Sequence, residues 1–477
     1  MSYRFAFGRP PAVAARGMVA TSQPLATRAG LRMLERGGNA ADAALAAAAV
    51  LCVTEPMSTG IGGDCFAIVW RDGKLEGLDS AGPAPRSADP VRPVEEHGPR
   101  SVTVPGAVAG WGAFAERYGR FGLDACLADA IDAAEKGFAI AARAAESWQR
   151  HGGPDELGPA PRVGDVVRFA DLGATLRRIA SGGPEAFYRG PVAEAIAAAS
   201  WLDEDDLAGF EPRWVEPLRI SYRGTEVVEL PPPTQGVVAL EALGLLERSS
   251  PNLAGRIRCA KLALEDGLAR VRDGADVSEL IDADYLDGRR RGEEAAVTEP
   301  AGGTVYLCAV DEDRMAVSFI QSLFDAFGSR VVAPGTGVVL QNRGACFAVS
   351  GAVEPGRRPY HTIIPGMLLR NGGLLGPFGV MGGFIQAQAH MQLVSGLVDD
   401  GLDPQAALDR PRFRVDGDAV RLEEGLWERA ADLEPLGYRT IRETDTFAFG
   451  GGQAILVRGE ALVGGSDPRK DGYAAGI

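Results

Sequence analysis

The sequence predicts an α+β protein in which layered sheets are covered by helices. Helical patterns dominate the chain before residue 304, and short strand patterns separated by glycine-containing turns dominate after it. The chain has 477 residues, and 46% of them are hydrophobic, which is enough for a large buried core. No internal repeat is visible in the sequence.

The N-terminal part is expected to begin with a strand and two helices. Val19–Thr21 has strand character, and Ser22 is expected to cap a helix that carries Pro24 in its first turn. Asn39 is expected to cap the second helix, Ala40–Cys52. Because this second helix is apolar on nearly all faces, we expect it to be buried.

A glycine-rich run, Met57–Asp64, separates the second helix from the strand Cys65–Trp70. A dinucleotide-binding loop follows a strand and opens a helix, whereas here the glycines precede the strand. We therefore expect close backbone packing in a core turn at this run and no phosphate site. Further helices are expected at 108–118, 121–150, 170–200, 257–271, from about 236, and from 381–384 to 397. Further strands are expected at 225–230, 331–332, 338–340, 366–369, 374–378, 453–457 and 461–463.

A hairpin that begins at Thr304 carries the functional argument. Gly302–Gly303 precedes the strand Thr304–Val310, which is followed by a turn at 311–314 and a return strand, Met315–Ile320. If the bond before Thr304 is cut, this residue gains an α-amine that titrates near ~7.7–8 and can act as the base for its own hydroxyl. The glycines would let the backbone bend for that cut. The alternative is an ordinary hairpin with a glycine hinge.

Composition and charge exclude several classes of function. A formal charge of −15 and a pI near 4.9 argue against nucleic acids and anionic membranes as partners. The six cysteines form no CxxC pair and the four histidines lack metal-ligand spacing, so we expect no disulfide framework, no metal and no cofactor. We find no signal-peptide pattern and no membrane span in the sequence, which favours a cytoplasmic location.

The chain resembles the γ-glutamyltransferase family of N-terminal-nucleophile hydrolases along almost its whole length. The motifs that carry the resemblance are Ala20–Ala26, Gly37–Ala43, Glu55–Gly63, Val104–Gly106, Pro231–Pro233 and Gly465–Arg469. The resemblance implies a four-layer αββα sandwich, made by one precursor that cleaves itself into a large part, 1–303, and a small part, 304–477. The two parts would share one core as a single domain and stay associated, and a homodimer is left open.

The resemblance also implies roles for individual residues. Thr304 stands where the family has its nucleophile, so the bond between Gly303 and Thr304 would be the one that is cleaved. Ser322 stands where a second hydroxyl, usually of threonine, hydrogen-bonds the nucleophile; it could instead be an ordinary polar strand residue. Gly382–Gly383 resembles the oxyanion-hole pair, since backbone N–H groups at a helix start can hold an anion, although a plain helix start is the alternative.

The residues that bind a glutamate zwitterion in the family are largely absent. Ala81 stands at the position of the arginine that holds the α-carboxylate, and Cys346 at that of the acidic residue that holds the α-amine. The seryl pair that also contacts the carboxylate is replaced by His361–Thr362. Arg343 is new: it could bind one carboxylate in a bidentate fork, or it could be a surface arginine paired with an acidic neighbour.

These departures favour the acylase-like branch of the family, and the short link 347–358 suggests an open pocket for bulkier or different amides. Our first hypothesis is a self-processing amide hydrolase that uses Thr304, through an acyl-enzyme, on small-molecule amides whose acyl part carries a carboxylate. Arg343, His361 and Thr362 are then the substrate-binding candidates. The alternatives are a glutathione hydrolase or γ-glutamyl transferase with a rebuilt amino-acid clamp, and an uncleaved, non-enzymatic scaffold.

Overall fold

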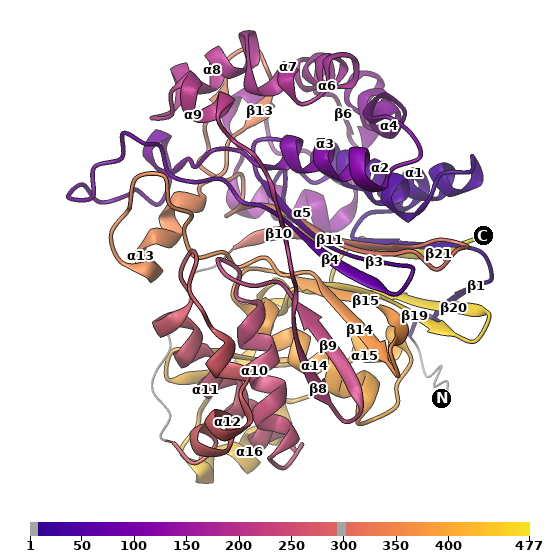
Figure 1. The fold of residues 1–477 in the computed structure, drawn as a ribbon, viewed down its shortest axis with the longest axis vertical. Coiled ribbons are helices and arrows are strands. Elements are labelled where there is room, and N and C mark those ends of the chain that lie inside the picture. Colours follow the sequence, from indigo (N-terminus) through magenta and orange to yellow (C-terminus); the bar gives the residue numbers. More distant parts are fainter. Residues whose placement is uncertain (1–7, 293–301) are drawn as a thin grey trace.

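A computed structural model of the protein describes residues 8–292 and 302–477. Within these residues the chain forms two seven-stranded sheets that pack face to face and carry helices on both outer faces (Figure 1). The layer order is helix, sheet, sheet, helix, which confirms the predicted αββα sandwich. In the described parts of the chain, every helix is too short or too polar to cross a membrane.

The first sheet, called sheet I here, contains the hairpin that begins beside Thr304. Its strands, in spatial order, are β21 (Tyr473–Gly476), β2 (Met18–Thr21), β10 (Gly303–Val310), β11 (Ala316–Phe324), β3 (Asp64–Arg71), β4 (Lys74–Ser80) and β7 (Arg213–Val215). Neighbouring strands are antiparallel. This sheet therefore combines strands from both sides of Thr304 in the sequence.

The second sheet, sheet II, lies beneath sheet I in Figure 1. Its strand β15 leads directly into Gly382–Gly383. Its strands, in spatial order, are β1 (Ala12–Ala14), β20 (Ala461–Ser466), β19 (Gly451–Arg458), β15 (Gly373–Met381), β14 (Gly366–Arg370), β9 (Thr225–Glu229) and β8 (Leu218–Tyr222). This sheet also combines strands from both sides of Thr304.

Two groups of helices cover the outer faces of the sheets (Figure 1). Those on the side of sheet I are α1 (Pro24–Glu35), α2 (Ala40–Thr54), α3 (Ala107–Tyr118), α4 (Leu123–Lys136), α5 (Ala142–His151), α6 (Ala170–Gly182), α7 (Glu185–Tyr188), α8 (Pro191–Ala199) and α9 (Glu204–Ala208). Those on the side of sheet II are α10 (Gly236–Glu247), α11 (Leu253–Arg270), α12 (Ala283–Arg289), α14 (Ile385–Val398), α15 (Pro404–Asp409) and α16 (Ala430–Leu433).

Shorter elements complete the described chain. A small three-stranded sheet is formed by β16 (Phe413–Asp416), β17 (Ala419–Glu423) and β18 (Arg439–Glu443). Two short ribbons are formed by β12 (Val332–Ala333) with β13 (Val338–Val339), and by β5 (Phe138–Ala139) with β6 (Val166–Val167). The short helix α13 (Phe347–Ser350) follows β13 in the chain and precedes β14.

The core has three layers, and β10 shows how the sequence builds them. Val305 and Leu307 pack against the helices above sheet I, whereas Tyr306 and Cys308 pack between the two sheets. Successive side chains of a strand point to opposite faces, so a strand covered on both sides must be apolar throughout. This explains why β10 is continuously hydrophobic. A third cluster joins sheet II to α10, α11 and α14.

The helix α2 and its cap agree with the prediction, whereas the predicted cap of α1 is wrong. The side chain of Asn39 accepts hydrogen bonds from the first turn of α2, every residue of which is buried. At α1 the cap is Gln23, whose Oε1 accepts from the backbone nitrogens of Leu25 and Ala26. Ser22 lies one residue before this cap, and its hydroxyl donates to Glu55.

Two other boundaries differ from the prediction. The helical stretch expected at 121–150 is interrupted between α4 and α5, because Gly137 adopts a φ of 93° and β5 follows it. The return strand, expected to end at Ile320, continues as β11 to Phe324 and thereby includes Ser322. Polar Gln321 and Ser322 ended the hydrophobic pattern in the sequence without ending the strand.

The glycine-rich run before β3 packs as predicted. A Cβ atom on Gly62 would lie 2.2 Å from the carbonyl oxygen of Val339, and one on Gly63 would lie 2.2 Å from that of Ser322. Side chains at these positions would collide with backbone atoms, so glycine is required here. The run therefore holds β11, and Ser322 with it, close to the end of α2.

Candidate active site

Thr304 occupies an irregular position at the start of β10. The β10–β11 register shifts between Gly303 and Val305, so that Thr304 lies at a bulge. Its side chain is buried, and its Oγ1 donates a hydrogen bond to the carbonyl oxygen of Gly303 at 2.7 Å. The hydroxyl is therefore next to the peptide bond that it would attack.

Ser322 contacts the same peptide bond from the neighbouring strand. Its Oγ lies 3.3 Å from Thr304 Oγ1 and donates to the carbonyl oxygen of Gly303 at 2.7 Å. It also accepts from the backbone nitrogen of Phe324 at 2.8 Å. Phe324 has a φ of 78°, a left-handed conformation that is uncommon outside glycine, and such strained residues often lie at functional sites.

The Gly382–Gly383 pair lies against the segment that precedes Thr304. It connects β15 to α14, and its residues have φ values of 127° and 72°. A Cβ atom on Gly302 would lie 3.1 Å from the Cα atom of Gly383, which places the segment before Thr304 directly against this pair. The structure thus brings Thr304 and Ser322 together and places Gly383 against the residue two positions before Thr304.

Gln386, which the sequence analysis missed, also reaches Thr304. It lies in the first turn of α14, and its Nε2 donates to Thr304 Oγ1 at 3.4 Å. Its Oε1 accepts from the backbone nitrogen of Ile364 at 3.1 Å, which fixes the amide orientation. The only signal in the sequence was its position three residues after Gly383.

Arg343 is a buried residue of the site, so its interpretation as a surface arginine is wrong. It is 0% exposed, and its guanidinium lies over the ring of Phe324 at 4.6 Å. Nη1 donates to Thr362 Oγ1 at 2.9 Å, and Nη2 donates to Ser322 Oγ at 3.2 Å. In the described part of the chain, no carboxylate forms an ion pair with it, and its Nε has no hydrogen-bond partner.

His361 is held by Asp64, a residue that the sequence analysis did not select. Its Nε2 lies 3.0 Å from Asp64 Oδ2, and both side chains are 0% exposed. Burial lowers the pKa of His361 well below its ordinary value, and the charges of Arg343 and Arg358 lower it further. His361 is therefore neutral and adds no positive charge to the site.

Asp64 joins four parts of the protein at this point. Its Oδ1 accepts from the backbone nitrogens of Gly82 and Gly106 and from Nε2 of Gln341, at 3.1, 3.0 and 2.9 Å. Burial raises its pKa to about 7, against the opposing effect of Arg343. Asp64 thus lies near Arg343 with both of its oxygens already occupied by other partners.

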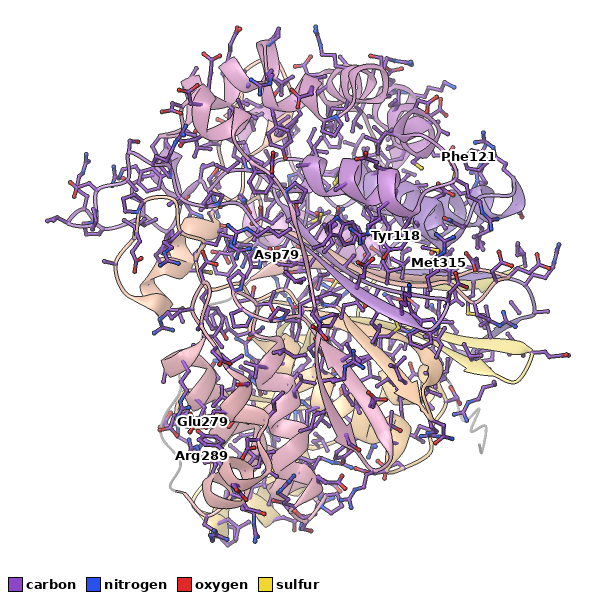
Figure 2. The ribbon with its side chains drawn as sticks, in the orientation of Figure 1. Asp79, Tyr118, Phe121, Glu279, Arg289 and Met315 are labelled. Carbon is purple, nitrogen blue, oxygen red and sulfur yellow. The ribbon has the colours of Figure 1, made fainter. Side chains whose placement is uncertain are left out.

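The two positions that would bind an amino-acid zwitterion are uncharged in the structure. Ala81 is buried beside Asp79, which lies near the end of β4 (Figure 2) and pairs with Arg358. Arg358 also pairs with Asp273 at 2.5 Å, so its charge is already matched by two carboxylates. Burial raises the pKa of the Cys346 thiol to about 11, which keeps it neutral.

One group of metal-ligand residue types lies close to this site. The ligand atoms of Glu96, His97 and Asp325 lie within 4.8 Å of one another. The carboxylate of Asp325 accepts from Asn342 at 3.1 Å, and Nδ1 of His97 contacts the carbonyl oxygen of Gly328 at 3.2 Å. Glu96 is exposed, and such groups occur commonly without an ion, so we assign no metal here.

Comparison with known proteins decides the family. The sequence model named Gamma-glutamyltranspeptidase matches residues 26–477. The chain belongs to the gamma-glutamyltranspeptidase family. As a member of this family the protein is an amidohydrolase or acyltransferase, and the resemblance inferred from its motifs is confirmed.

Individual gamma-glutamyltranspeptidase relatives cover nearly the whole chain. The chain is 33% identical to the oxamate amidohydrolase proenzyme of Klebsiella pneumoniae, over 97% of this chain and 99% of the relative. It is 32% identical to the glutathione hydrolase-like YwrD proenzyme of Bacillus subtilis, over 96% and 98%. The structure of a cephalosporin acylase from Bacillus halodurans superposes with a TM-score of 0.93 and 42% identity, over 100% and 98%.

Proposed function

We propose that the protein is a self-processing amide hydrolase with Thr304 as its N-terminal nucleophile. The observation that carries the proposal is the 2.7 Å separation of Thr304 Oγ1 from the carbonyl oxygen of Gly303, in an uncut chain. Cleavage there would give fragments 1–303 and 304–477. Because both sheets combine strands from the two fragments, we expect the fragments to stay associated. The relatives' names include the word proenzyme, which supports processing.

The freed α-amine of Thr304 would supply the base for turnover. An α-amine titrates near ~7.7–8, so part of it is unprotonated at neutral pH and can accept the hydroxyl proton. The Oγ1–carbon bond then forms, the amide C–N bond breaks, and the proton passes to the departing amine. Water hydrolyses the resulting ester, which releases the acid and restores Thr304. An amine in place of water would give acyl transfer.

The backbone of Gly382–Gly383 would stabilise the oxyanion during turnover. Gly302 lies against Gly383 in the uncut chain, so a substrate that takes the place of the cleaved segment would lie beside the same backbone. Backbone donors held at the start of α14 need no reorganisation when charge develops, which is why they are effective. Glycine there also allows a substrate carbonyl to approach closely.

The substrate is proposed to carry a carboxylate in its acyl part. Arg343 is fully buried, and among the described residues its near partners are hydroxyls, a thiol and a ring rather than carboxylates. A buried charge is costly until it is paired, so a substrate carboxylate would gain a strong, charge-assisted contact with Arg343. Thr362, which already bonds Arg343, would orient it. The relative named oxamate amidohydrolase supports this class.

A glutathione hydrolase with a rebuilt clamp is the second candidate, because relatives 29–32% identical to the chain carry that name or a derivative of it. Glutaryl and γ-glutamyl amides of one leaving group separate the two, since they differ by the α-amine. With Cys346 neutral, the amine finds no acidic partner at that position, and its desolvation costs energy. We expect a higher kcat/KM for the glutaryl amide. A large preference for the γ-glutamyl amide would instead support the second candidate.

A further inference from the structure

The hydroxyl of Ser322 has a fixed direction in the uncut chain. Its oxygen accepts from the backbone nitrogen of Phe324 at 2.8 Å and from Nη2 of Arg343 at 3.2 Å. A hydroxyl has two acceptor lone pairs and one proton. The hydroxyl of Thr304 lies 3.3 Å away, but its single proton bonds the nearer carbonyl oxygen of Gly303 at 2.7 Å, so Phe324 and Arg343 fill the acceptor capacity of Ser322. The proton of Ser322 is left to bond the carbonyl oxygen of Gly303, 2.7 Å away.

Arg343 strengthens that donated hydrogen bond. Its charge is fully buried, and in the described residues its nearest polar contacts are the hydroxyls of Ser322 and Thr362. Hydrogen bonds in a chain polarise one another, and charges act more strongly away from water. A guanidinium that donates to Ser322 Oγ therefore makes the Ser322 proton a better donor to Gly303.

We infer that Arg343 is a positioning residue for self-cleavage, acting through Ser322 on the oxyanion that forms at Gly303. This inference rests on the proposed function, in which Thr304 cuts the preceding bond. It adds a role for Arg343 before the enzyme is mature. Arg343 would thus act twice: it would assist the cleavage that forms the mature site, and it would then bind the substrate carboxylate in that site.

Self-cleavage would proceed through an ester between Thr304 and Gly303. Thr304 Oγ1 loses its proton and bonds the carbonyl carbon of Gly303, whose oxygen becomes the anion that Ser322 stabilises. When this intermediate collapses, the C–N bond breaks and the nitrogen of Thr304 takes up the proton, leaving an ester between the two residues. Water then hydrolyses the ester: its oxygen bonds the carbonyl carbon and the ester C–O bond breaks. Gly303 becomes a carboxylate, one proton restores the hydroxyl of Thr304, and the other protonates the freed α-amine.

The test is the rate of precursor cleavage in a double-mutant cycle. Pulse-labelled protein from cell-free synthesis is followed by denaturing gel for the wild type, Ser322→Ala, Arg343→Met and the double variant. We expect Ser322→Ala to slow cleavage by roughly 100- to 1,000-fold, the usual effect of losing one oxyanion donor, and Arg343→Met by about 10-fold or more. If Arg343 acts through Ser322, the double variant should be no slower than Ser322→Ala alone.

Two further variants separate this role from a purely structural one. Arg343→Lys keeps the positive charge, so its precursor should be cleaved faster than that of Arg343→Gln. This comparison replaces Arg343→Met if that variant does not fold. Cys346→Ala removes a contact to Nη1 at 3.8 Å without touching Ser322, so it should cleave at the wild-type rate. Melting temperatures, measured in the uncleavable Thr304→Ala background, show which variants are folded.

Losses that add in the double variant, or wild-type cleavage by Arg343→Gln, would overturn the role of Arg343. Neither result would touch the proposed function. Conversely, a Thr304→Ala precursor that still splits between residues 303 and 304 would remove the proposed function itself. The two failures are therefore distinguishable in one set of gels.

Discussion

The Nη2 atom of Arg343 lies 3.2 Å from the hydroxyl oxygen of Ser322, and both side chains are fully buried. The same hydroxyl contacts the carbonyl oxygen of Gly303. A positive charge is therefore connected through two successive hydrogen bonds to the peptide bond that we propose is cleaved. This arrangement links the proposed maturation of the enzyme to its proposed choice of substrate, because both depend on one guanidinium.

Gly383→Ala should impair turnover in the cleaved enzyme. Gly383 has a φ of 72°, which L-residues with a side chain rarely adopt, so alanine would move the backbone donors. Loss of one oxyanion donor typically lowers kcat by roughly 100- to 1,000-fold. The assay must count only molecules that carry a free Thr304, because Gly302 lies against Gly383 before cleavage. Unchanged kcat per cleaved molecule would place the oxyanion hole elsewhere.

Arg343→Met should weaken carboxylate-bearing substrates specifically. A hydrogen bond to a charged group contributes about 1.5–3 kcal/mol, so kcat/KM for the glutaryl amide should fall by roughly 10- to 100-fold. The pentanoyl amide of the same leaving group lacks the carboxylate and is the matched control. Rates are expressed per molecule with a free Thr304. An equal loss for both amides would show that Arg343 does not recognise the carboxylate.

Stability should depend on pH through Glu55. Burial raises the pKa of Glu55 to about 7, so the folded protein holds a proton that the unfolded chain releases near its ordinary value of 4.5. The unfolded state then binds fewer protons, and stability falls as pH rises between these two values. In the uncut Thr304→Ala background, Glu55→Gln should flatten this decline. The effect should be at most a few kcal/mol, since one pKa unit is about 1.4 kcal/mol. An unchanged slope of unfolding free energy against pH would refute it.

Gly63→Ala should disturb the strand that carries Ser322. A Cβ atom there would lie 2.2 Å from the carbonyl oxygen of Ser322, so β11 would have to shift. Overpacking of this kind costs typically about 1–3 kcal/mol, and we expect slower cleavage as well. Gly60→Ala is the control, because its nearest contact would be an ordinary 3.6 Å from Leu323. Equal melting temperatures and equal cleavage rates for the two variants would contradict the packing argument.

Most helices and strands, and the strand that begins beside Thr304, could be predicted from the sequence. The alanine-rich helix α2 and the hairpin at Thr304 have strong, local signals: an Asn39 cap, continuous apolar character and paired glycines. The resemblance supplied the αββα arrangement, because layer order depends on contacts between residues far apart in the chain. The cap of α1 was predicted one residue too early, because Ser22 and Gln23 are adjacent polar residues before Pro24 and no local pattern distinguishes them.

The polar partners within the site could not be predicted. Asp64 lies 297 residues before His361 in the chain, and no local pattern indicates that their side chains meet. The burial of Arg343 was equally hidden, because an arginine in a turn is usually exposed and its partners Ser322 and Thr362 lie in separate elements. Such pairings depend on how the two sheets stack, and periodicity carries no information about that.

The most direct test is the intact mass of the purified protein. We predict two species with the masses of 1–303 and 304–477, and Thr304 as the first residue of the smaller one. The Thr304→Ala variant should remain one chain of 477 residues and should show no amidase activity. A smaller fragment that begins at another residue, or a Thr304→Ala protein that is still cut at this bond, would contradict the assignment of Thr304 as the self-cleaving nucleophile.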